Sequence, residues 1–91
     1  MKKYTLDFTE KAKYHIRKLK KSGDKSIINK LNDLFEELRE HPSTGRGKPE
    51  FLKHLKYWSR KIDKKHRLCY RIQDDKVIVL VLSAYGHYED D

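Results

Sequence analysis

The spacing of the hydrophobic residues changes part-way along this chain, and this change limits the folds that the chain can adopt. In residues 9–40 the apolar residues recur at intervals of three or four, which is the spacing of a helix with one buried face. In residues 57–82 they alternate with polar residues or form a short continuous run, which indicates strands. Helices followed by strands predict an α+β protein.

Two helices are predicted in the first part of the chain. Thr9 can cap a first helix that runs to about Lys21, with Gly23 as its stop signal. Asp24 or Ser26 can cap a second helix, which stops before Pro42 because the residue preceding a proline disfavours helical backbone. The apolar stripe of the second helix consists of Ile27, Ile28, Leu31, Leu34, Phe35 and Leu38.

Four strands and a loop are predicted around these helices. Residues 2–7 suit a short edge strand, and residues 42–50, with two prolines and two glycines, suit a loop. Strands follow at residues 57–62, 66–72 and 77–82, and the last of them is predicted to be central because it is continuously apolar. The predicted order is therefore β-α-α-β-β-β, an antiparallel sheet with two helices packed on one face.

This arrangement leaves the other face of the sheet uncovered and basic. Arg67 and Arg71 alternate with the apolar residues of their strand, so they are expected on the uncovered face. Lys61 and Ser59 are expected on the same face if Trp58 points into the core. Such a face suits RNA.

Composition narrows the class of partner. The chain has 91 residues, which predicts a single domain over residues 1–91. Its 22 Lys and Arg against 14 Asp and Glu give a formal net charge of +8, which attracts nucleic acid, an anionic membrane or an acidic protein. Cys69 is the only cysteine, so no internal disulfide is expected; no signal-like or membrane-spanning run is visible, and a cytoplasmic protein is predicted.

Four residues together offer the chemistry for cutting RNA without a metal ion or a cofactor. Glu50 can take the proton from a ribose 2′-hydroxyl, and Arg67 can hold the charge that develops on the phosphate. His87 can return a proton to the leaving oxygen, and Tyr88 can orient His87, stack on a base or carry a proton.

Each of these residues also has a simpler interpretation. Glu50 can be a surface carboxylate that pairs with a lysine, and Arg67 can belong to a cross-strand ion pair. His87 and Tyr88 can belong to a frayed chain end. Any one of them alone therefore carries little weight, and the catalytic interpretation depends on their combination.

Basic residues between positions 46 and 71 are candidate phosphate anchors, although each by itself is a typical solvated side chain. The substrate-binding candidates are Lys48, Lys53, Lys61 and Arg71, and the same group includes Arg46, Arg60, Lys64 and Lys65. Cys69 is interpreted as a strand residue and not as a nucleophile, because no thiolate-activating motif surrounds it. The histidines interpreted as surface or packing residues, without metal-ligand spacing, are His15, His41, His54 and His66.

Four segments of the chain occur in an order and spacing typical of one family. They are residues 47–53 (GKPEFLK), 58–62 (WSRKI), 66–70 (HRLCY) and 86–88 (GHY). Together they resemble the Txe/YoeB toxins of the RelE-like superfamily, which belong to bacterial type II toxin–antitoxin modules. The resemblance implies a microbial-RNase-like fold and a ribosome-dependent mRNA endoribonuclease that inhibits translation. The implied partners are mRNA, the ribosome with its rRNA and a cognate antitoxin. Whether the free protein forms a homodimer stays open, and no membrane partner is expected.

The resemblance also implies roles for individual residues. The functional residues of the family fall on Glu50, Arg67, His87 and Tyr88, and basic helpers fall on Lys53 and Lys61. The chain departs from the family at Tyr85, where relatives often carry a basic residue. It also continues past Tyr88 with three acidic residues, 89–91, which either act on the neighbouring histidine and phosphate or form a frayed tail.

Two other functions stay open at this point. A toxin of the same fold but of the ParE type would act on a topoisomerase without cutting RNA, and the combination of Glu50, Arg67 and His87 argues against it. A basic nucleic-acid-binding module without toxicity is the other alternative, and the sequence carries no RRM, KH or helix-turn-helix signature.

Overall fold

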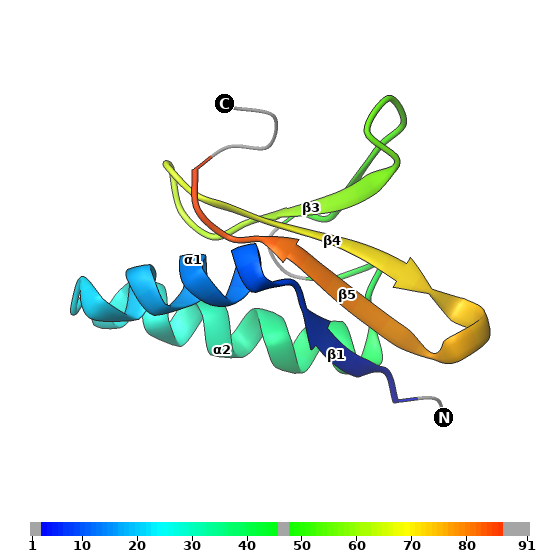
Figure 1. Cartoon of the computed structure of the whole chain (residues 1–91), viewed down its shortest axis with the longest axis horizontal. Coiled ribbons are helices and arrows are strands. Elements are labelled where there is room, and N and C mark those ends of the chain that lie inside the picture. Colours follow the sequence, from blue (N-terminus) through cyan, green and yellow to red (C-terminus); the bar gives the residue numbers. More distant parts are fainter. Residues whose placement is uncertain (1–2, 46–47, 87–91) are drawn as a thin grey trace.

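A computed structural model describes residues 3–45 and 48–86 of the chain. Within these residues, two helices pack on one face of a five-stranded sheet (Figure 1). The elements are β1 (Thr5–Phe8), α1 (Glu10–Lys21), α2 (Lys25–Glu40), β2 (Glu50–Leu52), β3 (Tyr57–Lys61), β4 (Arg67–Gln73), a 3-10 turn (Asp74–Lys76) and β5 (Ile78–Ser83). The predicted α+β class is confirmed.

The helices begin and end at the residues that the sequence predicted. The side chain of Thr9 caps α1 by accepting a hydrogen bond from the backbone N–H of Ala12 at 3.0 Å. The carboxylate of Asp24 caps α2 by accepting from the N–H of Ser26 at 3.0 Å. Gly23 joins the helices with a φ of 76°, a left-handed conformation that glycine adopts without strain. Neither helix is long and apolar enough to cross a membrane, in the part of the chain that the structure describes.

The hydrophobic core lies between the helices and the sheet. It joins the apolar stripe of α2 to the inward-facing residues of β4 and β5, as the predicted alternation requires. Phe8 of β1 also packs edge-on against Phe35 of α2, with ring centroids 5.5 Å apart. The core side chains with almost no exposed surface are Ala12, Leu19, Leu31, Leu34, Leu38, Leu68, Tyr70, Val79, Val81 and Ala84.

The strand order is β1-β5-β4-β3-β2, so β1 is an edge strand and β5 an inner strand, both as predicted. The pairing of β1 with β5 is parallel, however, with Thr5 opposite Ile78, while the other pairs are antiparallel. The predicted antiparallel sheet is therefore confirmed except at the β1–β5 pair. Both helices and three strands separate β1 from β5 along the chain, and no hairpin turn between them sets the direction of pairing.

The segment that begins at Glu50 forms strand β2, whereas the sequence predicted a loop over residues 42–50. β2 pairs with β3, and Glu50 lies opposite Ser59. Three residues are too few for an alternating pattern to be recognised in a sequence, and Pro49 beside them favours a loop interpretation. Pairing with β3 therefore determines this conformation, and it places Glu50 on a strand.

Arg60 is fully buried, so the interpretation of this residue as a phosphate anchor was wrong. It alternates with Ser59 and Lys61 along β3 and therefore points to the helix side of the sheet. Its guanidinium donates hydrogen bonds to the hydroxyl of Tyr70 at 2.8 Å and to the carbonyl of Thr44 at 2.6 Å. Arg60 thus fixes the segment that follows α2.

Candidate active site

A row of polar side chains crosses the uncovered face of the sheet on four strands. Glu50 of β2 lies opposite Ser59 of β3, which lies opposite Cys69 of β4, which lies opposite Ser83 of β5. Directly opposed residues on neighbouring strands project from the same face, so these four side chains are neighbours. Register alone therefore brings Glu50 to the face on which the sequence placed Arg67.

Arg67 lies over this row and is held in a fixed orientation. Its Nε donates a hydrogen bond to the hydroxyl of Ser59 at 2.8 Å, and an Nη atom lies 3.5 Å from the carboxylate of Glu50. Lys61 is the cross-strand partner of Arg67, so the prediction that Ser59, Lys61 and Arg67 share one face is confirmed. The positive charge at this point of the surface has a fixed position, as electrostatic stabilisation of a developing charge requires.

Glu50 and Arg67 differ in their access to solvent. The Glu50 side chain is 55% exposed, whereas the Arg67 side chain is 17% exposed. The carboxylate can therefore reach a ligand or turn away from Arg67, while the guanidinium stays in place. A structural cross-strand ion pair and a catalytic pair would both have this geometry. Activity measurements on variants of Glu50 and Arg67 distinguish these two interpretations.

The end of the described chain is fixed beside Arg67. The backbone N–H of Arg67 donates to the carbonyl of Gly86 at 2.9 Å, and the N–H of Gly86 donates to Nδ1 of His66 at 2.8 Å. We call these two hydrogen bonds the Gly86 clamp. The candidate residues His87 and Tyr88, which follow Gly86 in the sequence, lie outside the described residues.

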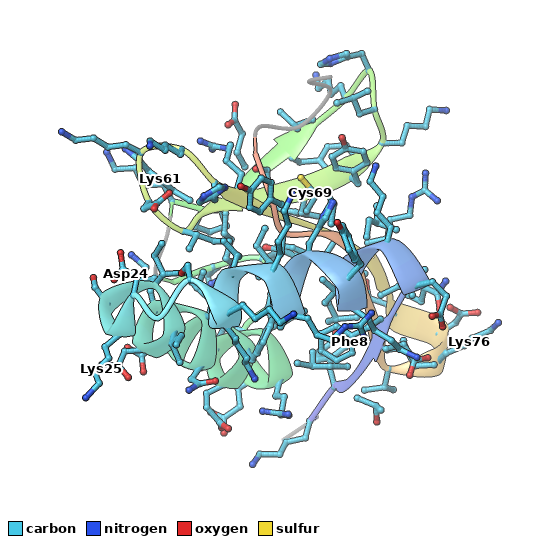
Figure 2. The ribbon with its side chains drawn as sticks, turned by 60° about the vertical axis from the view of Figure 1, so that its left-hand side comes forward. Phe8, Asp24, Lys25, Lys61, Cys69 and Lys76 are labelled. Carbon is cyan, nitrogen blue, oxygen red and sulfur yellow. The ribbon has the colours of Figure 1, made fainter. Side chains whose placement is uncertain are left out.

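The predicted substrate-binding residues are spread over a larger area. Lys61 is exposed at the end of β3 (Figure 2). It lies opposite Arg67 in the register of β3 and β4. Lys48, with a φ of 50°, and Lys53 are exposed on either side of β2. Arg71 is exposed on β4, and the four residues from Arg67 correspond to roughly 13 Å along a strand. The structure thus places Lys61 close to Arg67 and Arg71 farther away.

Cys69 lies in the middle of the polar row but is only 1% exposed. Burial raises the pKa of its thiol, although hydrogen bonds with Ser83 and Ser59 and the charge of Arg67 lower that pKa in part. Cys69 is therefore a strand residue, as the sequence predicted, and because its thiol is buried it lacks the accessible thiolate of a nucleophile.

Sequence reasoning missed how the segment before Glu50 is anchored. Besides Arg60, the hydroxyl of Tyr70 takes part by donating to the carbonyl of Pro42 at 2.8 Å. Alternation along β3 and β4 places both side chains on the helix side, and this signal was available in the sequence. The anchored segment leads towards β2 and so contributes to the position of Glu50.

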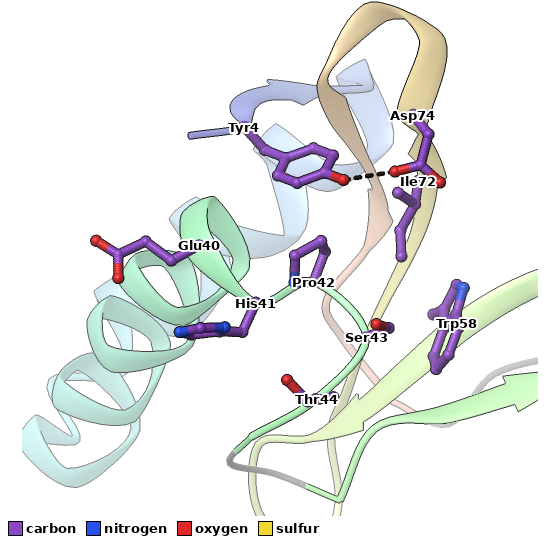
Figure 3. A pocket seen from close by; sticks show the side chains of 9 residues that line it. All are labelled: Tyr4, Glu40, His41, Pro42, Ser43, Thr44, Trp58, Ile72 and Asp74. Atoms are coloured by element: carbon purple, nitrogen blue, oxygen red, sulfur yellow. Dashed lines mark hydrogen bonds between the residues drawn. The ribbon is translucent and has the colours of Figure 1, made fainter. Parts of the chain in front are cut away.

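A pocket of about 510 Å³ lies between the end of α2 and the sheet, and it is separate from this site. Figure 3 shows its lining, in which the hydroxyl of Tyr4 donates to Asp74 and Trp58 lies across from His41. The hydrogen bond to Asp74 raises the pKa of Tyr4. Neither Glu50 nor Arg67, the two catalytic candidates within the described residues, lines this pocket.

Comparison with known proteins identifies close relatives. A family model for the YoeB-like toxin of bacterial type II toxin-antitoxin systems matches residues 8–88. "Toxin YoeB" of Escherichia coli (strain K12) is 45% identical over 67 residues, which are 71% of this chain and 77% of the relative. "mRNA interferase toxin RelE" of the same strain is 35% identical over 81 residues, which are 89% of this chain and 80% of the relative.

Solved structures of YoeB toxins have folds similar to that of this chain. A "YoeB/ParE toxin from Agrobacterium tumefaciens" has a TM-score of 0.80 and 31% identity, over 92% of this chain and 99% of that one. A "heterotetrameric complex of YoeB-YefM toxin-antitoxin from Staphylococcus aureus" has a TM-score of 0.75 and 32% identity, over 93% and 98% of the two chains. A "YoeB dimer from Staphylococcus aureus" has a TM-score of 0.75 and 32% identity, over 94% and 99%.

Proposed function

Because this chain belongs to the YoeB-like toxins of bacterial type II toxin–antitoxin systems, we propose that it is an endoribonuclease that cuts mRNA on the ribosome and so inhibits translation. The relative from Escherichia coli described as an mRNA interferase supports this activity. The net charge of +8 favours a polyanionic substrate.

The proposed reaction uses the nucleophile that RNA itself carries. Glu50 removes the proton from a ribose 2′-hydroxyl, and the oxygen attacks the adjacent phosphorus. Arg67 stabilises the additional negative charge on the phosphate oxygens, and His87 donates a proton to the departing 5′-oxygen. Tyr88 assists His87. The products are a 2′,3′-cyclic phosphate, which hydrolyses to a 3′-phosphate, and a 5′-hydroxyl, and no metal ion takes part in this scheme.

The observation that carries the proposal is the pairing of Glu50 with a fixed Arg67. The two groups lie 3.5 Å apart on the sheet face opposite the helices, and Ser59 holds the guanidinium. The Gly86 clamp holds Gly86 beside Arg67, and His87, the proposed second proton carrier, follows Gly86 in the sequence. A proton acceptor, a fixed cation and a second proton carrier are the groups that this reaction needs.

The toxin is proposed to bind a cognate antitoxin and a second copy of itself in the cytoplasm, where ribosomes are present. The related complex with YefM and the related YoeB dimer support these partners. We expect the antitoxin to lay an acidic segment, disordered before binding, across the basic sheet face and to block Glu50 or His87.

Induction in cells tests the function. Expression of the chain without an antitoxin should stop growth, and primer extension on cellular mRNA should then reveal new ends inside translated regions. Growth arrest with intact mRNA would favour a non-cleaving toxin of the ParE type. Normal growth with intact mRNA would favour the third alternative, a nucleic-acid-binding module without toxicity.

A further inference from the structure

A row of four aromatic rings extends from the candidate active site to α1. His66 and Tyr85 have ring centroids 4.5 Å apart, Tyr85 and His15 5.9 Å, and His15 and Tyr14 6.1 Å. We call these four residues the aromatic row. It starts at the Gly86 clamp, because His66 accepts the hydrogen bond from Gly86 and Tyr85 directly precedes Gly86.

Two rings of the aromatic row are exposed to solvent, and the ammonium group of Lys18 lies near both of them. Tyr14 is 55% exposed and Tyr85 is 41% exposed, so both rings are accessible to a ligand from solvent. The Nζ atom of Lys18 lies 4.3 Å from the ring centroid of Tyr85 and 5.7 Å from that of Tyr14. Folding alone would not require two accessible tyrosines around a lysine.

His15 keeps the middle of the row rigid and uncharged. Its Nδ1 accepts a hydrogen bond from the backbone N–H of Ala84 at 3.2 Å. Burial, followed by the nearby charges of Lys11 and Lys18, lowers its pKa from 6.5, so the ring is neutral at pH 7. A neutral ring in a fixed position offers a flat surface on which another planar group can stack.

An open pocket of about 590 Å³ adjoins the inner end of the row. Lys18, Lys64 and Lys65 contribute positive charge to its lining, together with His66 and Tyr85. The carboxylates of Asp24 and Asp63 also line it. Asp24 accepts hydrogen bonds from the backbone N–H groups of Ser26 and Ile27, and Asp63 accepts from those of Lys65 and His66. The pocket thus combines a planar ring with cations that suit phosphate.

We propose that the aromatic row and this pocket form a binding site for single-stranded RNA, in which an unpaired base stacks on Tyr85, a neighbouring base stacks on Tyr14, and Lys18 binds the phosphate between them. Accessible rings interleaved with cations are the features by which proteins bind single strands without reading their sequence. The inference rests on the proposed function for the identity of the strand. Because Tyr85 adjoins the Gly86 clamp beside Arg67, the strand that continues from the scissile phosphate is the occupant.

An abasic scan of the substrate tests the site. The probe is a short single-stranded RNA with a 2′-O-methyl group at the cleaved ribose, which prevents cleavage, and its affinity for the full chain is measured by fluorescence anisotropy. Removal of one base near the cleavage point should weaken binding to the wild-type protein about 5- to 100-fold, the effect of losing one base–aromatic stack. The same removal should have little effect on binding to Tyr85→Ala, while Tyr85→Phe should behave like the wild type.

A matched pair of lysine variants tests the phosphate contact. Lys18→Ala and Lys21→Ala remove the same charge from α1, but Lys18 alone of the two has a ring contact in the described structure. Lys18→Ala should weaken RNA binding and reduce its salt dependence, and Lys21→Ala should change both much less. Tyr14→Ala provides a second ring variant whose exposed position spares the fold.

The outcomes separate this inference from the proposed function. Equal abasic effects in the wild type and in Tyr85→Ala would overturn the site, and so would equal effects of the two lysine variants. If Tyr85→Ala lost as much affinity for ribosomes without message as for ribosomes with message, the row would belong to an rRNA contact and the proposal would also fail. Failure of the wild type to cut ribosome-bound message would instead refute the proposed function, while the abasic scan would still decide whether this surface binds single strands.

Discussion

Arg60 and Arg67 lie on adjacent strands and have opposite roles. Arg67 is on the uncovered face, where it binds Ser59 and Glu50. Arg60 is on the covered face and has no exposed surface. The alternation along β3 is sufficient to predict this difference, because Trp58 and Arg60 share a face. This difference was not recognised from the sequence, because the chain has many basic residues and arginine is rarely buried completely.

Replacing Arg60 tests its structural role. Arg60→Ala removes a buried hydrogen-bond donor from the carbonyls of His41 and Thr44 and from the hydroxyl of Tyr70, so the free energy of unfolding should fall by about 2–5 kcal/mol. Lys61→Ala, the exposed neighbour, should change it by less than about 0.5 kcal/mol. Urea denaturation measures both values. Equal stability of the two variants would contradict the buried network and return Arg60 to the candidate phosphate anchors.

His15 should make stability depend on pH. Its pKa is lowered in the folded protein by burial and by Lys11 and Lys18, so the unfolded chain binds the proton more readily. The contribution of the neutral ring is complete above about pH 6.5 and is lost as the pH falls through the lower folded-state pKa. His15→Asn keeps an acceptor for the N–H of Ala84 but does not titrate. Between pH 7 and pH 5, the wild type should lose more stability than this variant in urea denaturation, and parallel curves would contradict the assignment.

At the level of elements, local signals predicted the helices and the inner strands. Thr9 and Asp24 cap the helices by side-chain hydrogen bonds, and such signals depend only on neighbouring residues. β2 could not be predicted, because its conformation depends on pairing with β3 across a turn. The parallel pairing of β1 also depends on contacts far apart in sequence. The sequence placed Arg67, Ser59 and Lys61 on one face correctly, but only the register of β2 brings Glu50 to them.

The position of a lysine or arginine along its strand should determine how much it contributes to RNA binding and cleavage. Lys61 is opposite Arg67, whereas Arg71 lies four residues farther along β4. Lys61→Ala should therefore weaken binding of toxin to programmed ribosomes and slow cleavage more than Arg71→Ala, although both remove one positive charge. Sedimentation binding at several salt concentrations compares them. A larger effect of Arg71→Ala would contradict this prediction and would indicate that the RNA passes over the far end of β4.

At the level of the whole molecule, the candidate site combines segments that are distant in sequence. Glu50, Arg67 and Gly86 come together only in the folded sheet, so a partner that covers this face can block all of them together. The basic surface predicts that antitoxin binding weakens as salt concentration rises, because charges on both partners are screened. Titration calorimetry at low and high salt measures this effect. A complex in which the antitoxin contacts only the helical side would contradict blocking of the sheet face.

The most direct test of the account compares cleavage of ribosome-bound message by purified wild-type toxin and by Glu50→Ala, Arg67→Ala and His87→Ala. Each variant should fold like the wild type, since Glu50 is exposed and Arg67 lies outside the hydrophobic core. Each should cleave about 10²–10⁴-fold more slowly, the usual contribution of a positioned acid, base or cation. The wild-type product should carry a 5′-hydroxyl. Full activity of Arg67→Ala would contradict the residue assignment, and a 5′-phosphate on the product would contradict the mechanism, because attack by the 2′-oxygen cannot generate it.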